Sequence, residues 1–230
     1  MRKTVLITGA SDGVGKQLAI LLSKEFDLII CGRRQEKLNE TVSKLDKSCS
    51  YYASAFDITD RKEQESFLNY IKEHYDSLFG LVNNAGANIA NEEIKDMSLE
   101  SFERMMNLNC YAPLLMIQGV YSLLKKESLS HIVNIHSTCC LYSNSRHAGY
   151  SASKSAFESL CKILVKEAKN DNILVSNIYP GGIDSNFRTA EKKEYLRPLT
   201  VAKAIETCLK NDDGSIQQLV LRPSCEDNFA

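Results

Sequence analysis

The segment TVLITGASDGVGKQLAILL, residues 4–22, decides the fold class of this chain. It starts as a short β-prone run that ends at Thr8, passes through a turn with Gly9, Gly13 and Gly15, and continues with apolar residues at helical spacing. Glycines let the backbone turn sharply and let a diphosphate approach the free N–H groups at a helix N-terminus. The glycine order is neither G-x-G-x-x-G nor a Walker A loop, and a bare tight turn is the alternative. The position straight after the first strand favours phosphate binding.

The rest of the chain repeats this alternation of strand and helix. Seven β-prone runs are separated by longer segments of helical period: residues 5–8, 28–31, 51–56, 78–82, 132–135, 174–178 and 216–221. Asp60 and Glu63 have the spacing of a capping pair at the start of one helix. Strict alternation predicts βαβ units, and therefore an α/β fold with a doubly wound sheet of about seven parallel strands and helices on both faces. Because no linker or internal repeat interrupts the pattern, residues 1–230 are expected to form a single domain.

The composition argues against several classes of partner. The 230 residues carry 28 basic and 29 acidic side chains, so no positive excess predicts binding to nucleic acid or to an anionic membrane. The N-terminal apolar run, Val5 to Ile7, is too short for a signal peptide or a membrane span. Eight cysteines without a CxxC pair or regular spacing are typical of reduced thiols in a cytoplasmic protein. The four histidines form no metal-ligand pattern, so no metal is expected.

Ligands of open α/β sheets bind beyond the carboxyl ends of the strands, which draws attention to the turn Cys31-Gly32-Arg33-Arg34 after the second strand. NAD-binding sheets commonly place a carboxylate there for the ribose 2′-hydroxyl, whereas arginine accommodates a 2′-phosphate. Two arginines and no acid favour NADP(H), with NAD as the other option and a solvated helix start as the alternative role of the arginines. Asp12, in the glycine turn, argues in the opposite direction.

Three later turns are expected at the same crevice. After the third strand, Asp57 is suited either to accept a hydrogen bond from adenine or to cap the next helix. After the fourth, the small, amide-rich turn 83–86 is suited to hydrogen bonding with a cofactor, or is simply a strand-ending turn. After the sixth, residues 180–185 form a rigid turn at the mouth of the crevice.

The stretch SHIVNIHSTCCLYSNSRHAGYSASK, residues 130–154, carries the candidate chemistry. A β-prone run leads to Ser137, and Tyr150 and Lys154 lie one helical turn apart. A nearby ammonium lowers the pKa of a phenol, so Tyr150 could exchange a proton with a substrate oxygen to which Ser137 donates a hydrogen bond. Such a site interconverts a carbonyl and an alcohol if a cofactor carries the hydride. Tyr121 and Lys125 have the same spacing, but no residues around them suggest chemistry, and they are expected to be an ordinary helix-surface pair.

Together these motifs resemble the short-chain dehydrogenase/reductase family from Thr4 to about Ser185. The matching motifs are T-G-x-x-x-G-x-G at residues 8–15, N-N-A-G at 83–86, Y-x-x-x-K at 150–154, a serine thirteen positions before the tyrosine, and Asn109 in the central helix. The resemblance implies a Rossmann-type fold with a short substrate region at about 181–200. It implies that Ser137 orients the carbonyl and that Tyr150 is the general acid in reduction and the base in oxidation.

The resemblance also implies that Lys154 holds the nicotinamide ribose and biases Tyr150, while Asn109 anchors a water that joins Lys154 to solvent, unless it is only a core amide. It further implies a homodimer or homotetramer through helices near 98–125 and 149–169. The positions expected to contact the cofactor are Gly9, Ser11, Asp12, Gly13, Val14, Gly15, Arg33, Arg34, Asp57, Ile58, Asn84, Ala85, Gly86, Tyr150, Lys154, Pro180, Gly181, Ile183 and Ser185.

The expected function is therefore that of a cytoplasmic NADP(H)-dependent oxidoreductase that reduces a ketone or aldehyde, or runs backward on an alcohol. A non-catalytic NAD(P)-binding regulatory or scaffolding protein is the alternative, and an epimerase or dehydratase, which usually has a longer substrate portion, is a third. The sequence departs from the family pattern at His136, where a second serine is common, in the short stretch after Ser185, and in the ending PSCEDNFA. Substrate identity, the direction of reaction and the role of Cys139 and Cys140 stay open at this point.

Overall fold

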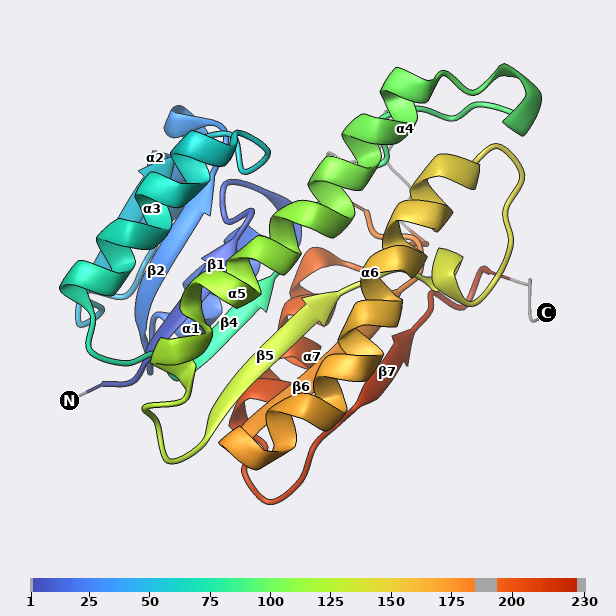
Figure 1. The fold of residues 1–230 in the computed structure, drawn as a ribbon. Coiled ribbons are helices and arrows are strands. Elements are labelled where there is room, and N and C mark those ends of the chain that lie inside the picture. Colours follow the sequence, from blue (N-terminus) through green and yellow to red (C-terminus); the bar gives the residue numbers. More distant parts are fainter. Residues whose placement is uncertain (1, 185–193, 227–230) are drawn as a thin grey trace.

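A computed structural model describes residues 2–184 and 194–226 of the chain. They contain one sheet of seven strands, all paired in parallel, in the order β3-β2-β1-β4-β5-β6-β7 (Figure 1). The strands are β1 Thr4–Thr8, β2 Asp27–Gly32, β3 Tyr51–Ala55, β4 Gly80–Asn83, β5 Ser130–Ile135, β6 Ile173–Pro180 and β7 Gln218–Leu221. Each coincides with one of the seven predicted runs to within two residues at either end. The parallel sheet is therefore confirmed.

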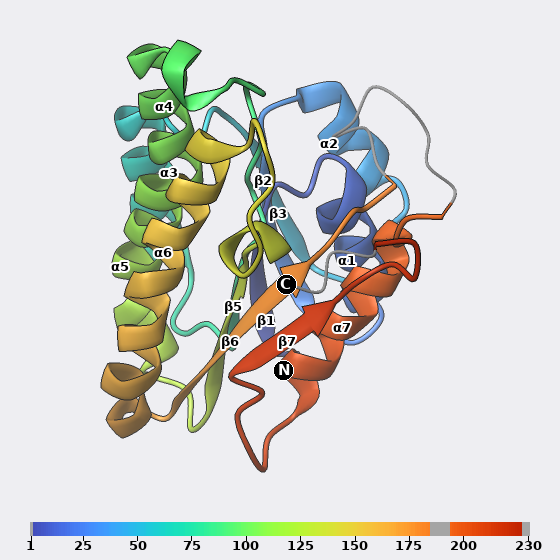
Figure 2. The same ribbon diagram turned by 90° about the vertical axis from the view of Figure 1, so that its right-hand side faces the viewer.

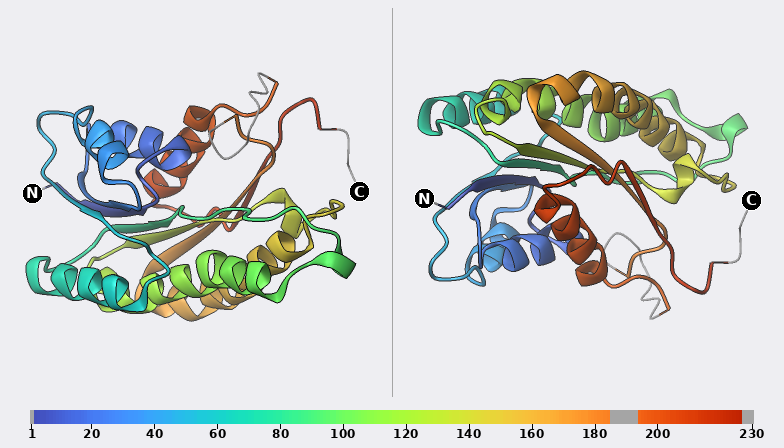
Figure 3. Two further views of the ribbon diagram at one scale, coloured as in Figure 1. Left: turned by 90° about the horizontal axis from the view of Figure 1, so that it is seen from above. Right: turned by 90° about the horizontal axis from the view of Figure 1, so that it is seen from below.

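Helices cover both faces of the sheet (Figures 2 and 3). One layer holds α1 Gly13–Leu22, α2 Gln35–Val42 and α7 Pro198–Lys210, and the other holds α3 Arg61–His74, α4 Leu99–Met106, α5 Ala112–Leu124 and α6 Ala148–Glu167. The strands supply apolar side chains to two cores: in β1, Val5 and Ile7 pack on the α1 side, and Leu6 packs on the α5 side. Burial on both faces explains why the central strands are largely apolar runs, whereas the edge strands β3 and β7 are partly exposed. No helix in the described ranges is long and apolar enough to cross a membrane.

The strand order reverses between β1 and β4. The chain runs outward from β1 through β2 to β3, then returns to place β4 on the other side of β1. The crevice where the two directions diverge, beyond the carboxyl ends of β1 and β4, is where doubly wound sheets bind ligands.

The start of α3 corrects two sequence predictions. Asp60 is the N-cap and accepts from the backbone N–H groups of Lys62 and Glu63, at 2.9 and 3.1 Å, as predicted. Glu63, however, accepts from the N–H of Asp57 at 2.9 Å, because the N–H of Asp60 already donates to the carbonyl of Asp57. The idea that Asp57 caps this helix is wrong, since Asp60 occupies the cap.

The predicted helix over residues 98–125 contains a π-helical turn, Asn107–Tyr111, between α4 and α5. Pro113 has no N–H to donate to the carbonyl of Asn109, which breaks the regular ladder at this position. The N–H of Ala112 bonds instead to the carbonyl of Asn107, five residues back. The widened turn lies where the helix carries Asn109.

Candidate active site

The glycine turn after β1 has the backbone that its sequence predicts. Gly9 and Gly13 have positive φ angles of 70° and 52°, which disfavour residues with a side chain. Gly15 has no room for one, because a Cβ there would overlap the carbonyl oxygen of Gly9. The turn therefore holds the N-terminus of α1, with its free N–H groups, close to the end of β1. This geometry is suited to a diphosphate.

Hydrogen bonds fasten this turn to the end of β4. Oγ1 of Thr8 accepts from the N–H groups of Asn84 and Ala85, both at 3.0 Å. The side-chain amide of Asn84 donates back to the carbonyls of Thr8 and Gly9, at 2.9 and 3.2 Å. Because the amide protons of Asn84 are used in this way, its side chain serves the shape of the glycine turn.

Asn109 is fully buried and fixes the loop that follows β4. Its Oδ1 accepts from the N–H of Ala87 at 3.0 Å, and its Nδ2 donates to the carbonyl of Ala87 at 2.9 Å and to Oγ of Ser153 at 3.1 Å. Lys154 is 4% exposed, and its Nζ donates to the carbonyl of Ile135 at 2.8 Å. Burial lowers the pKa of the Lys154 ammonium. Nearby cysteines raise this pKa and so partly offset the effect of burial. A Cβ at Gly86 would lie 2.9 Å from both Asn109 Oδ1 and Lys154 Nζ.

A cavity of about 960 Å³ opens beyond the carboxyl ends of the central strands. Ser137, Tyr150 and Lys154 line it together. The predicted cofactor positions that also line it are Gly9, Ser11, Asp12, Gly13, Val14, Arg33, Arg34, Asp57, Ile58, Asn84, Ala85, Gly86, Pro180, Gly181 and Ile183. Gly15 and Asn109 lie behind the wall, and Ser185 falls outside the described residues, as does part of the expected substrate region 181–200. One cavity thus contains three of the four candidate catalytic side chains and both ends of the predicted cofactor site.

Sequence reasoning missed two arginines of this wall, Arg61 at the start of α3 and Arg104 in α4. Arg61 follows the turn after β3. The rule that ligands bind beyond the carboxyl ends of the strands could therefore have predicted its place at the cavity. No local signal marks Arg104, because the tertiary fold brings α4 to the cavity. Burial favours the neutral form of Asp57, but hydrogen bonds from Thr59 and the charges of Arg33 and Arg104 hold its pKa below the ordinary value.

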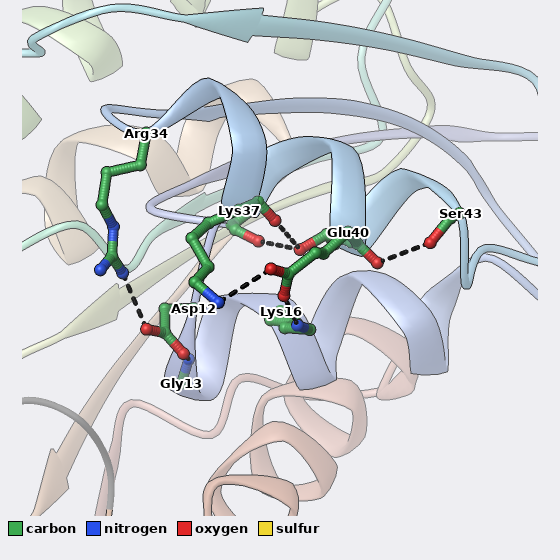
Figure 4. Close-up of polar contacts among 9 residues, drawn as sticks. Asp12, Gly13, Lys16, Arg34, Lys37, Glu40 and Ser43 are labelled. Carbon is green, nitrogen blue, oxygen red and sulfur yellow. Dashed lines mark hydrogen bonds and ion pairs between the residues drawn. The ribbon is translucent and has the colours of Figure 1, made fainter.

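The turn after β2 contributes Arg33 and Arg34. Arg34 Nη2 lies 2.7 Å from Asp12 Oδ2, and the side chain of Arg34 is half exposed (Figure 4). Arg33 forms no ion pair with any residue that the structure describes. The two adjacent arginines therefore differ in their pairing: Arg34 has a carboxylate at hydrogen-bonding distance, and Arg33 has no ion pair among the described residues.

His136 reaches the cavity wall but is held in the core. Its ring is 2% exposed, donates from Nε2 to Oδ1 of Asn177 at 3.0 Å, and stacks on Tyr179 with ring centroids 5.3 Å apart. Burial, aided by the charge of Lys154, lowers the pKa of His136 to about 3, so the imidazole is neutral. Cys139 is buried and Cys140 is half-buried, and neither lines the cavity.

The last described residues reach this end of the molecule. The N–H of Gly182 donates to Oε1 of Glu226 at 2.7 Å, and Arg222 Nε lies 3.3 Å from Oε2 of Glu226. The guanidinium of Arg222 also lies 4.7 Å from the centroid of the Tyr142 ring. These contacts join the turn after β6 to the loop after Ser137, and the sequence carried no signal for them.

The sheet order, the glycine turn and the cavity define a Rossmann-type dinucleotide-binding architecture. Residues 3–196 match the family model described as short chain dehydrogenase, and the chain belongs to this family as an oxidoreductase. An uncharacterised oxidoreductase from Staphylococcus epidermidis is 25% identical over 226 residues, with 96% of this chain and 97% of the relative covered.

Two solved structures share the fold. An alcohol dehydrogenase from the archaeon Thermococcus sibiricus, complexed with 5-hydroxy-NADP, superimposes with a TM-score of 0.90 at 22% identity and covers 98% of both chains. A 7α-hydroxysteroid dehydrogenase complexed with NADH has a TM-score of 0.87 at 23% identity and covers 96% of this chain and 93% of its own. Of these two neighbours, the first was solved with a phosphorylated dinucleotide and the second with an unphosphorylated one.

Proposed function

We propose that the protein is an NADP(H)-dependent oxidoreductase that reduces a ketone or aldehyde to the alcohol, or runs the reverse reaction. The observation that carries this proposal is that Ser137, Tyr150 and Lys154 line the same cavity as the glycine turn and Arg33. Family membership and relatives named as oxidoreductases favour this function over a non-catalytic binding protein of the same fold.

The cavity fits a pyridine dinucleotide along its length. The N-terminus of α1 and the positive-φ glycines suit the diphosphate, Asp57 and Ile58 suit adenine, and Arg33 suits a 2′-phosphate. At the other end, the turn 180–183 would flank the nicotinamide. A bound nicotinamide ring would supply or accept the hydride.

The side chains of the chain itself would handle the proton and the substrate oxygen. Ser137 Oγ accepts from the N–H of Cys139 at 3.2 Å, which orients the hydroxyl, and its own proton can be donated to a substrate carbonyl. Tyr150 would donate its phenolic proton to that oxygen in reduction and accept it in oxidation. The buried Lys154 would place a positive charge beside the forming phenolate and stabilise it. Asn109 would keep the loop against Lys154 in place.

The proposal is tested by Tyr150→Phe, with Tyr121→Phe as the matched control. Tyr121 also has a lysine four residues on, but its hydroxyl donates to Asp171 at 2.8 Å, and burial raises its pKa to about 12. Turnover of NADPH should be measured with a panel of ketones and aldehydes. We expect Tyr150→Phe to lose about a thousandfold in kcat, the range of general acid catalysis, and Tyr121→Phe to keep it. Equal turnover by the wild type and Tyr150→Phe would refute the role of the tyrosine.

Assembly and location are part of the same proposal. We propose a homodimer or homotetramer that involves α4, α5 and α6, to be checked by light scattering, where a monomer would contradict it. We further propose a cytoplasmic location, which is supported by the eight cysteines being free thiols.

A further inference from the structure

Two adjacent cysteines follow the candidate catalytic serine and hold it in place. They end a short 3₁₀ turn, Thr138–Cys140, of which Ser137 is the N-cap. The N–H of Cys139 donates to Oγ of Ser137 at 3.2 Å, and the N–H of Cys140 donates to the carbonyl of Ser137 at 3.0 Å. A change in the backbone of the cysteine pair therefore changes the support of the serine hydroxyl.

The two thiols share one environment but differ in exposure. Cys139 is 8% exposed, whereas Cys140 is half-buried and accessible from outside the cavity. Hydrogen bonding with the Cys140 thiol lowers the pKa of Cys139, and the same contact raises the pKa of Cys140. The hydroxyls of Ser137 and Ser151 and the charge of Lys154 lower the pKa of Cys139 further, while burial opposes the shift. The pair therefore shares one negative charge, and a thiolate is the form of cysteine that attacks an oxidant.

The other six cysteines lack this combination of a neighbouring thiol, partial exposure and stabilised charge. Burial raises the pKa of five of them, Cys31, Cys49, Cys110, Cys161 and Cys208. A buried thiol with a raised pKa stays protonated and reacts slowly. The sixth, Cys225, is exposed and lies beyond β7, with no cysteine next to it in the chain.

We propose that Cys139 and Cys140 form a modification site, where a hydroperoxide oxidises the two thiols to a disulfide and thereby disturbs Ser137. One thiolate attacks the peroxide and becomes a sulfenic acid, and the oxygen that leaves takes up a proton. The second thiol then attacks the sulfenic sulfur and releases water. With hydrogen peroxide as the oxidant, the two thiols lose two hydrogens and two electrons, and the peroxide becomes two waters.

The disulfide would force the turn into another conformation. Neighbouring Cα atoms are about 3.8 Å apart, whereas disulfides ordinarily join Cα atoms that are roughly 4.4–6.8 Å apart. We expect the backbone to rotate between the two cysteines and the bond from Cys139 N–H to Ser137 Oγ to break. A strained disulfide is also readily reduced, so the modification is reversible. The effect on catalysis rests on the proposed function, whereas the oxidation itself does not.

Hydrogen peroxide treatment of the full chain tests this inference. Turnover of NADPH with a carbonyl substrate, NADPH affinity and intact mass should be measured before and after treatment, with peptide mapping to locate the change. We expect a loss of about 2 Da located at residues 139–140. We expect kcat to fall about a hundredfold, the cost of misplacing one donor to the substrate oxygen, with NADPH affinity changed less than about twofold. Dithiothreitol should restore both mass and turnover.

Three variants separate the pair from single thiols. Cys139→Ser and Cys140→Ser each leave one thiol, so neither should form the internal disulfide or show the reversible loss of turnover. Cys225→Ser, which removes the exposed thiol, is the control and should be inactivated like the wild type. The mass and peptide map of the wild type decide the question even if a variant fails to fold.

Two results would overturn the inference: no disulfide at residues 139–140 after peroxide treatment, or full turnover by a chain that carries it. Protection by Cys225→Ser would assign the inactivation to the exposed thiol and would also overturn it. An untreated wild type that turns over no carbonyl compound would instead overturn the proposed function. The loss of mass would still report on the thiol pair in that case, so the two failures are distinguishable.

Discussion

The two ends of the cavity are built in different ways. At the end formed by the glycine turn, which we propose holds the diphosphate and call the diphosphate end, the wall consists of turns directly attached to strands. Thr8 and Asn84 fasten these turns to each other. At the end lined by Ser137 and Tyr150, which we propose receives the substrate and call the substrate end, the neighbouring loops are joined by contacts between distant parts of the chain. Arg146 Nη2 donates to the carbonyl of Asn91 at 3.2 Å, and Glu226 accepts from the N–H of Gly182 at 2.7 Å.

This difference separates a part of the wall that is built from backbone turns from a part that depends on contacts between particular side chains. The diphosphate end needs a strand, a glycine turn and a helix, which any nucleotide-binding member of the fold can supply. The substrate end depends on side chains in loops and at the C-terminal side of β7. Changes at the first end should affect stability and nucleotide binding together, whereas changes at the second should affect substrate binding alone.

Among the substitutions that compare the two ends, the largest effect is expected from Gly15→Ala at the diphosphate end. The added methyl would overlap the carbonyl oxygen of Gly9, so we expect a loss of about 3 kcal/mol in the free energy of unfolding and weaker binding of both nucleotides. Gly214→Ala is the matched control, because a Cβ there meets nothing within 4 Å. Urea unfolding and nucleotide titration measure both variants. Wild-type stability in Gly15→Ala would mean that the turn adapts more easily than its geometry indicates.

Acid should destabilise the protein through buried histidines that lie outside the diphosphate turns. Burial lowers the pKa of His131 to about 4 and that of His136 to about 3, against an ordinary value of 6.5. The unfolded chain takes up these protons as the pH falls below 6.5, and the native chain does not, so stability is lost as the pH falls. From pH 7 to pH 5 the loss is about 2 kcal/mol for each histidine.

Urea unfolding at these two pH values checks this prediction. His131→Leu should remove about half of the histidine contribution to the pH dependence, since His131 and His136 contribute similarly over this range. His74→Gln, at an exposed histidine, is the matched control. An identical pH slope in the wild type and His131→Leu would contradict the assignment.

Arg33→Ala tests how the diphosphate end distinguishes the two cofactors. We expect NADPH binding to weaken about tenfold, the loss of one charge-assisted contact, with NADH binding changed less than about twofold. Lys47→Ala, which removes the same charge from an exposed site away from the cavity, is the control. Parallel losses for NADPH and NADH would show that Arg33 does not contact a 2′-phosphate.

The smallest effect is expected at the substrate end, from Glu226→Ala. Without the carboxylate, the turn after β6 loses its bond at Gly182 and its link to Arg222, so KM for the carbonyl substrate should rise about threefold. Nucleotide affinity should stay constant. Glu226→Gln should lie between the wild type and Glu226→Ala, because an amide oxygen still accepts from the Gly182 N–H. A change in NADPH affinity equal to the change in KM would contradict the prediction that the substrate end affects substrate binding alone.

The sequence predicted the fold more completely than the site. The central strands were found because a strand buried on both faces is a continuous apolar run between turn residues. The edge strands β3 and β7 are partly exposed, and they were found from their short β-prone runs within the alternating pattern. The positive φ of Gly9 and Gly13 follows from their place in a turn between strand and helix. The capping partner of Glu63 was missed because the N–H of Asp60 is already used within its own turn.

The amino-acid sequence by itself determined the class of fold, the diphosphate turn and the spacing of Tyr150 and Lys154, because each depends on backbone periodicity and on hydrogen bonds between near neighbours. Only the tertiary structure decided that Asp12 pairs with Arg34, that Arg104 reaches the cavity, and that Glu226 holds Gly182. These contacts join residues that no local pattern relates, since the packed sheet and its crossovers set the distance between them.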